Sequence, residues 1–140
     1  MHITVVPAST RTAQATIELL LADKAAPTVT GVYRSLSKVP ANFSAHPNFK
    51  AVQGDILDGA SLDFSGSDAL LAITPPQYIE SDIVADARKM AENTKAAAQK
   101  AGVRRLVLLS SSGAEFDKGT VGCDPTPPLD RRYGHTDGNV

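Results

Sequence analysis

The chain has 140 residues, of which 42% are hydrophobic and 21% charged, so it is long enough for one packed globular domain. Fourteen basic and fifteen acidic residues give a formal net charge of −1, which argues against nucleic acid or an anionic membrane as the main partner. The single cysteine, Cys123, excludes an intramolecular disulfide framework. Because no apolar run resembles a signal peptide or a membrane span, we expect a cytoplasmic protein.

The first half of the chain alternates between β-rich and helical patterns. Residues 3–6 form a β-branched run that ends at Pro7, and a helical pattern follows over about residues 10–23, with Ser9 or Thr10 as its N-cap. β-rich runs at residues 28–33 and 49–53 predict the second and third strands. This part therefore predicts one crossover helix and three strands.

The second half continues the same alternation. A continuous apolar run at residues 69–73 predicts a buried strand, an amphipathic pattern predicts a helix over about residues 81–101 with Gly102 at its end, and residues 106–109 predict a fifth strand. Continuous apolar strands alternating with helices favour a parallel sheet. We predict an α/β, Rossmann-like parallel sheet of about five strands in the order 3-2-1-4-5, with flanking helices.

The expected domain covers residues 1–116. Residues 117–140 are polar and rich in glycine and proline without periodicity, which predicts a tail and no separate substrate domain.

A strand, a tight turn and a helix bind a dinucleotide in doubly wound sheets, because the helix N-terminus offers free N–H groups to the pyrophosphate. The turn here reads Val-Pro-Ala-Ser-Thr-Arg-Thr-Ala over residues 6–13. Other short motifs follow in order: Val-Tyr-Arg-Ser at 32–35, Gln-Gly-Asp-Ile-Leu-Asp at 53–58, Ala-Ile-Thr-Pro-Pro at 72–76 and Ala-Gly-Val-Arg-Arg-Leu-Val-Leu-Leu-Ser-Ser at 101–111.

Together these motifs resemble the atypical short-chain dehydrogenase/reductases, and especially the NmrA-like NAD(P)-binding family, over about residues 1–116. The resemblance implies an NAD(P)-binding Rossmann domain of an oxidoreductase. It places Arg34 at the adenosine ribose phosphate and Asp55 and Ile56 at the adenine. It also implies that Thr74 and Pro75 lie beside the nicotinamide ribose.

The turn departs from the family pattern, because Pro7, Thr10 and Ala13 occupy its three glycine positions. The hydroxyls of Ser9, Thr10 and Thr12, together with Arg11, offer substitute donors to phosphate. Two outcomes stay open, a substituted phosphate site and a lost one. If a dinucleotide binds, Arg34 and the absence of an acidic residue after the second strand favour NADP(H) over NAD(H).

The sequence predicts no catalytic residue. Reductases of the wider superfamily pair a tyrosine with a lysine four residues later, whereas Tyr133 is followed at that spacing by Asp137. The serines at 110–112 are more typical of strand-end hydrogen bonding, and the scattered histidines predict no metal site.

Three hypotheses follow. The first is an NADPH-dependent oxidoreductase domain acting on a small-molecule substrate, truncated or degenerate, because the family runs to roughly twice this length. The second is a non-catalytic protein that senses a nucleotide or serves as a scaffold. The third is a homo-oligomer completed through the edge of the fifth strand.

Overall fold

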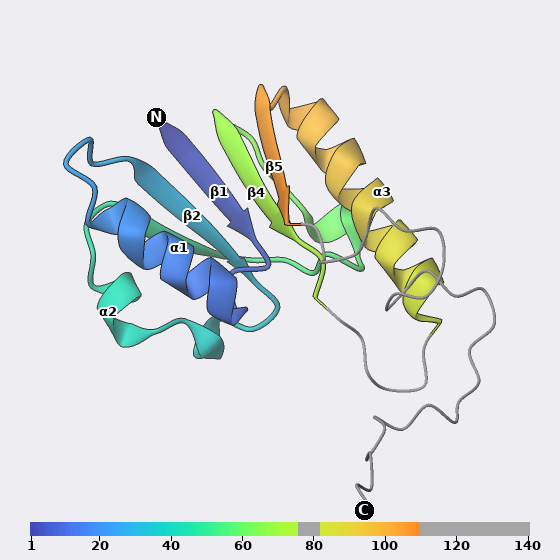
Figure 1. Ribbon diagram of the computed structural model, residues 1–140, viewed down its shortest axis with the longest axis horizontal. Coiled ribbons are helices and arrows are strands. Elements are labelled where there is room, and N and C mark those ends of the chain that lie inside the picture. The colour runs from blue at the N-terminus through green and yellow to red at the C-terminus, as the bar shows by residue number, and fades with distance from the viewer. Residues whose placement is uncertain (76–81, 110–140) are drawn as a thin grey trace, which may run out of the picture. The chain divides into compact units, whose positions relative to one another are not determined.

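A computed structural model describes residues 1–75 and 82–109. Five strands, β1 (His2–Val6), β2 (Thr28–Tyr33), β3 (Phe49–Gln53), β4 (Ala69–Ile73) and β5 (Arg105–Leu109), form one sheet. Their order is β3-β2-β1-β4-β5, and every neighbouring pair is parallel (Figure 1). The predicted fold class and strand order are confirmed, and all five carboxyl ends meet at one edge of the sheet.

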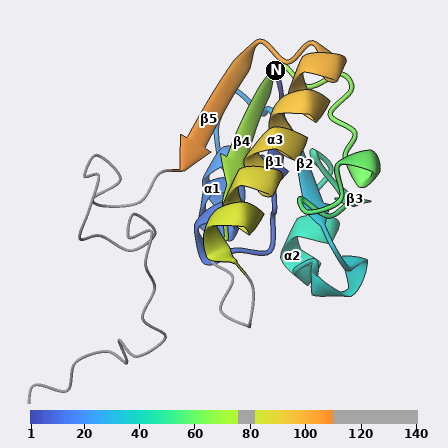
Figure 2. The same cartoon turned by 90° about the vertical axis from the view of Figure 1, so that its right-hand side faces the viewer.

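Helices cover both faces of this sheet. Helix α1 (Arg11–Leu21) and the short α2 (Ala41–Ser44) lie on one face, and α3 (Ile83–Ala101) lies on the other (Figure 2). Two 3₁₀ turns, η1 (Leu36–Lys38) and η2 (Gly59–Ser61), follow β2 and β3. The two long helices were predicted with nearly these bounds, whereas α2, η1 and η2 are too short for a sequence period to reveal.

Alternate residues of the strands fill two separate core layers. Val5 and Tyr33 point towards α1, where they pack with Ile17. Val6 and Leu70 point the other way, into the layer closed by Ala97 and Ala98 of α3. The sheet is therefore buried on both sides around β1, which explains its uninterrupted apolar strands.

Capping residues set the ends of the long helices. The side chain of Thr10 accepts a hydrogen bond from the N–H of Ala13 and begins α1, and Asp82 accepts from the N–H groups of Val84 and Ala85 at the start of α3. Gly102 ends α3 in the left-handed region, with φ of 67°. The expected caps at Thr10 and Gly102 are confirmed.

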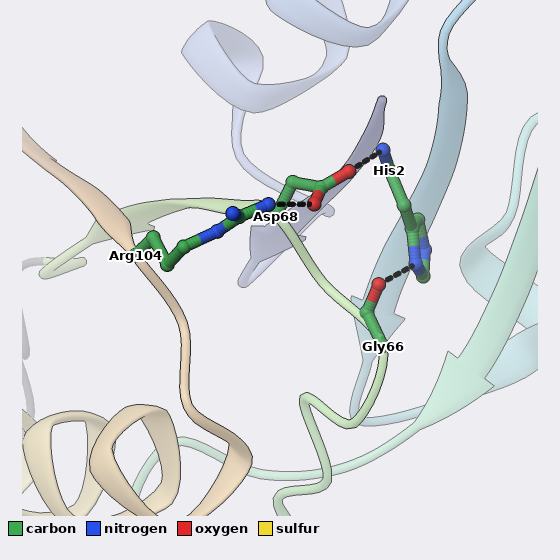
Figure 3. A network of polar contacts seen from close by, with 4 residues as sticks. All are labelled: His2, Gly66, Asp68 and Arg104. Atoms are coloured by element: carbon green, nitrogen blue, oxygen red, sulfur yellow. Dashed lines mark hydrogen bonds and ion pairs between the residues drawn. The ribbon is translucent and has the colours of Figure 1, made fainter.

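A polar network ties the amino ends of the central strands together (Figure 3). The Asp68 carboxylate accepts from the backbone N–H of His2 and from the Arg104 guanidinium, each at 2.9 Å. The His2 ring contacts the Gly66 carbonyl at 3.0 Å and the Thr30 hydroxyl at 2.8 Å. Because a carbonyl only accepts, Nδ1 of His2 carries the proton and donates it there. The His2 N–H, and after it Arg104, holds the pKa of Asp68 below its ordinary value.

The apolar strand β5 is poorly covered. The exposed fractions of Leu106, Val107, Leu108 and Leu109 are 46%, 59%, 65% and 47%. Within the described residues β5 pairs only with β4. Both faces of this edge strand thus present apolar surface, unlike any other strand of the sheet.

Several predictions concern residues that the structure does not describe. The boundary at 116, the tail 117–140, Cys123, the serines at 110–112 and the Tyr133–Asp137 spacing all lie outside the described residues. Among the helices that are described, none is both long and apolar enough to cross a membrane.

Candidate functional site

The turn between β1 and α1 lies tightly against β2. Ala8 is fully buried, and its N–H donates to the Val32 carbonyl at 2.8 Å. Pro7 has no N–H to give. The turn is thus anchored on the neighbouring strand β2 through Ala8, the residue after Pro7.

The close approach of the turn depends on a glycine in β2 instead. A Cβ placed on Gly31 would lie 3.0 Å from the Cβ of Ala8 and 2.8 Å from Cε2 of Tyr33. Such contacts are shorter than van der Waals packing allows, so a larger residue at 31 would displace the turn or the tyrosine. The glycine that lets the turn approach the sheet closely thus lies in β2, at Gly31, and not in the turn itself.

The start of α1 keeps free donors at the same edge. Thr10 caps the N–H of Ala13 at 3.2 Å, while the N–H groups of Arg11 and Thr12 have no acceptor within the helix. Aligned peptide dipoles add partial positive charge here. The Thr10 hydroxyl accepts one bond and still has its own hydrogen to donate, so the turn can serve an anion without glycines.

A small pocket of about 130 Å³ opens beside this turn. Residues following β1, β2, β3 and β4 line it, namely Pro7, Ser9, Thr10, Arg34, Asp55, Ile56, Leu57 and Pro75. The carboxyl edge of an open parallel sheet is where such folds bind ligands. A pocket of this volume can hold one part of a dinucleotide but not the whole molecule.

Six of the nine residues predicted from the sequence line this pocket: Ser9, Thr10, Arg34, Asp55, Ile56 and Pro75. The structure does not bring the side chains of Arg11, Thr12 and Thr74 into it. Arg11 and Thr12 lie on the exposed first turn of α1, where only their backbone N–H groups face the start of the helix. Thr74 is exposed at the end of β4.

Two lining residues were not proposed from the sequence as ligand contacts. In the sequence Pro7 stands out only as a departure from the glycine pattern, and Leu57 follows the two residues that the resemblance places at the adenine. The place of Leu57 inside the motif at residues 53–58 is the sequence signal that could have identified it, because consecutive residues of a short loop can line the same pocket.

The loop after β3 is held by its own hydrogen bonds. The Asp55 carboxylate accepts from the N–H of Leu57 at 3.0 Å, and the Asp55 N–H donates to the Ser61 hydroxyl at 2.8 Å. Ser61 in turn donates to the Asp58 carbonyl at 2.7 Å. Asp55 therefore shapes the loop as well as lining the pocket.

Arg34 supplies the positive charge of the pocket. It follows β2 directly, its side chain is exposed, and it takes part in no ion pair within the described part of the chain. Its backbone carbonyl accepts from the Gln53 amide at 3.2 Å, which ties the ends of β2 and β3 together. The guanidinium is thus free to receive an anionic ligand such as a phosphate.

A larger hollow of about 340 Å³ lies at the opposite edge, lined by Met1, Asp68, Arg104 and Arg105. None of the residues predicted for a site lines it, and two of its lining residues, Asp68 and Arg104, are already paired with each other in the network of Figure 3. In the ranges 1–75 and 82–109 no three His, Cys, Asp or Glu side chains converge as metal ligands would.

Residues 8–128 match the model of a protein family described as NAD(P)H-binding. The chain belongs to this NAD(P)H-binding family. The match begins inside the turn, at Ala8, and covers β5 and every pocket residue except Pro7, so the expected resemblance is confirmed. Among curated proteins there is no match.

Solved structures with the same fold include two oxidoreductases and an NAD(P)-binding protein. Triphenylmethane reductase from Citrobacter sp., complexed with NADP(H), is 26% identical with a TM-score of 0.63, over 76% of this chain and 36% of that one. The quinone oxidoreductase QOR2 from Escherichia coli, complexed with NADPH, is 24% identical with a TM-score of 0.60, over 77% and 36%. A Rossmann-fold NAD(P)-binding protein from Shigella flexneri is 23% identical with a TM-score of 0.59, over 75% and 49%.

The chain spans about half or less of the length of these three structures. What is shared is the Rossmann fold with its dinucleotide edge, and the pocket beside the β1–α1 turn lies at that edge. The chain is thus a member of an NAD(P)H-binding family and has a Rossmann fold.

Proposed function

We propose that this chain binds NADPH at the carboxyl edge of its sheet and supplies the dinucleotide site of a reductase acting on a small molecule. The observation that carries the proposal is the pocket in which Ser9, Thr10, Arg34, Asp55 and Ile56 meet from three different strand ends. Their residue types offer hydroxyl donors, a cation and an apolar wall, which suit phosphate and adenine.

Preference for NADPH over NADH rests on Arg34. Its exposed guanidinium has no ion-pair partner among the described residues, and Ser35 follows where an acidic residue would hold an unmodified ribose. A phosphate on the ribose would give this arginine a charge-assisted hydrogen bond.

Calorimetric titration of the purified chain with NADPH and NADH tests both claims. We expect NADPH to bind more tightly than NADH. Arg34→Ala should weaken NADPH binding by about tenfold or more, because a hydrogen bond to a charged group is lost, and should change the affinity for NADH little. Lys38→Ala, an exposed cation of η1 outside the pocket, is the matched control. No heat with either dinucleotide rejects the site, and tighter NADH binding rejects the role of Arg34.

The second candidate function is a non-catalytic nucleotide-binding regulator or scaffold. The observation that favours it is Asp137, which stands where reductases of the wider superfamily place a lysine after the tyrosine. An acidic neighbour raises a tyrosine pKa, which is opposite to what proton transfer at neutral pH needs.

Turnover separates the two functions. The reductase function predicts loss of NADPH absorbance with an acceptor from a panel of quinones, carbonyls and triphenylmethane dyes, because hydride passes from NADPH to the acceptor. The regulator function predicts NADPH binding without oxidation by any acceptor. The Arg34→Ala variant is measured in the binding assay and in the turnover assay. If NADPH oxidation is a true activity of the chain, the rate at a fixed NADPH concentration should fall together with the affinity for NADPH.

We also propose that the chain associates with a second copy through β5. The support is the apolar surface on both faces of this strand and its pairing, within the described residues, with β4 alone. Open edges with apolar side chains favour pairing between chains.

A further inference from the structure

Helix α3 contacts the pocket wall through Asn93. The side-chain amide of Asn93 donates to the backbone carbonyl of Ile56 at 3.0 Å, across 37 positions of the sequence. Ile56 lines the pocket, whereas Asn93 does not. The half-buried asparagine therefore stands behind the wall and can reach a ligand only through the loop.

The other side of the Asn93 side chain is in contact with Gly59. A Cβ on Gly59 would lie 2.8 Å from Oδ1 and 3.0 Å from Cγ of Asn93, so glycine leaves room for the amide. One end of the amide thus bonds the loop at Ile56, and the amide also packs against η2 at Gly59.

The hydrogen bond from Asn93 fixes the loop after β3 to helix α3, which the bonds within the loop do not do. The bonds of Asp55 with Leu57 and Ser61 join residues within the loop, so they set its shape but not its distance from the helical layer. Met90, Thr94 and Ala97 of α3 are buried. Ala97 packs in one core layer with Val6 and Leu70 of the sheet, which makes the helix a firm support. Asn93 joins the loop to that support.

We propose that Asn93 is a positioning residue for the adenosine end of the dinucleotide. The inference rests on the proposed function, because Asp55 and Ile56 contact adenine only if the pocket binds NADPH. Removal of the amide leaves the Ile56 carbonyl without this donor and lets the wall shift, so affinity falls at the adenosine end.

The test measures the dissociation constants of NADPH and of adenosine 2′,5′-bisphosphate, which lacks the nicotinamide half. We expect Asn93→Ala to weaken both by the same factor, about three- to tenfold, as for loss of one neutral hydrogen bond. Asn93→Asp keeps the shape of the side chain but removes the donor, so it should weaken both at least as much. It carries the test if the alanine variant does not fold.

A matched control separates positioning from general stability. Ala98→Gly lowers the stability of the same helix in its buried layer, at a residue that does not line the pocket, and should leave both dissociation constants unchanged while the melting temperature falls. If Ala98→Gly weakens binding as much as Asn93→Ala, or if neither Asn93 variant changes binding, the inference is overturned. If the unmodified chain binds neither ligand, the proposed function fails and the inference fails with it.

A substitution at Gly59, on the loop side of the contact with Asn93, gives an independent check. Gly59→Ala pushes a methyl group against Asn93 and should weaken NADPH binding in the unmodified chain. In the Asn93→Ala background the space is vacant, so the same substitution should cost little more. Simple additivity of the two losses would contradict the proposed contact, since residues that act through one contact are not additive.

Discussion

At the scale of single residues, the core beneath the turn contains one uncompensated polar group. The Tyr33 ring is fully buried among apolar side chains, and its hydroxyl has no hydrogen-bond partner within the described residues. Burial also raises the pKa of Tyr33 above its ordinary value of 10.0, because the charged form loses its solvation. Sequence patterning places this residue in a buried strand but gives no sign that its hydroxyl lacks a partner.

Tyr33→Phe should therefore leave stability at neutral pH unchanged or raise it by up to about 1 kcal/mol, because it removes an unsatisfied group. The raised pKa means that the fold loses stability as the pH rises above 10.0 towards the folded-state value, and the phenylalanine variant lacks this loss. Urea unfolding of both proteins at neutral pH and above pH 10 measures it. A variant destabilised at neutral pH would show that the hydroxyl has a partner after all.

At the scale of elements, the long periodic segments were predictable and the short ones were not. Five apolar runs and two amphipathic patterns predicted β1 to β5, α1 and α3, because burial on one or both faces imposes a period on the sequence. Helix α2 spans only Ala41–Ser44, and η1 and η2 have three residues each. Such turns show no period, and their neighbours decide their conformation.

The packing of the β1–α1 turn on β2 gives a prediction for this scale. Gly31→Ala should destabilise the fold by about 1–3 kcal/mol through overpacking against Ala8 and Tyr33. It should also weaken NADPH binding, because the turn that lines the pocket moves. Urea unfolding and calorimetry measure the two effects.

Gly102→Ala is the matched control for that experiment. It strains the left-handed end of α3 by about 1–2 kcal/mol, and the added Cβ has no neighbouring atom within 4 Å. The stability of the fold should therefore fall while the affinity for NADPH stays the same. Equal affinity in both variants would show that the turn does not depend on Gly31.

At the scale of the whole molecule, burial is uneven across the sheet. β1 lies between two strands and two covered faces, whereas β5 exposes its four apolar residues 106–109. Among the residues that the structure describes, β5 pairs on one side only, with β4. An apolar strand with an unpaired edge favours association, since burial of its surface and pairing of its backbone both lower the free energy.

We expect the average mass of the 140-residue chain, measured by light scattering, to rise with protein concentration. The double variant Val107→Lys and Leu108→Lys, which places one charge on each face of β5, should reduce that rise. Leu19→Lys, at an apolar residue 74% exposed on α1, is the control and should change nothing. A monomer at every concentration would refute association through β5.

The sequence by itself determined the order of strands and helices, the parallel sheet and the edge of the sheet at which the candidate pocket lies. It could do so because each buried element has a period and because right-handed crossovers leave few ways to arrange parallel strands. The residues after β1, β2, β3 and β4 were thereby identified as neighbours before any distance was known.

Only the tertiary structure decided which of those residues meet. It brings Ser9, Arg34 and Asp55 to one pocket and leaves Arg11 outside, because the turn is anchored through Ala8 and α1 begins at once. It also joins Asn93 to Ile56, and no local pattern could show a contact between a helix and a loop 37 positions apart. Periodicity reports which face of an element is buried, but packing alone selects the neighbour it is buried against.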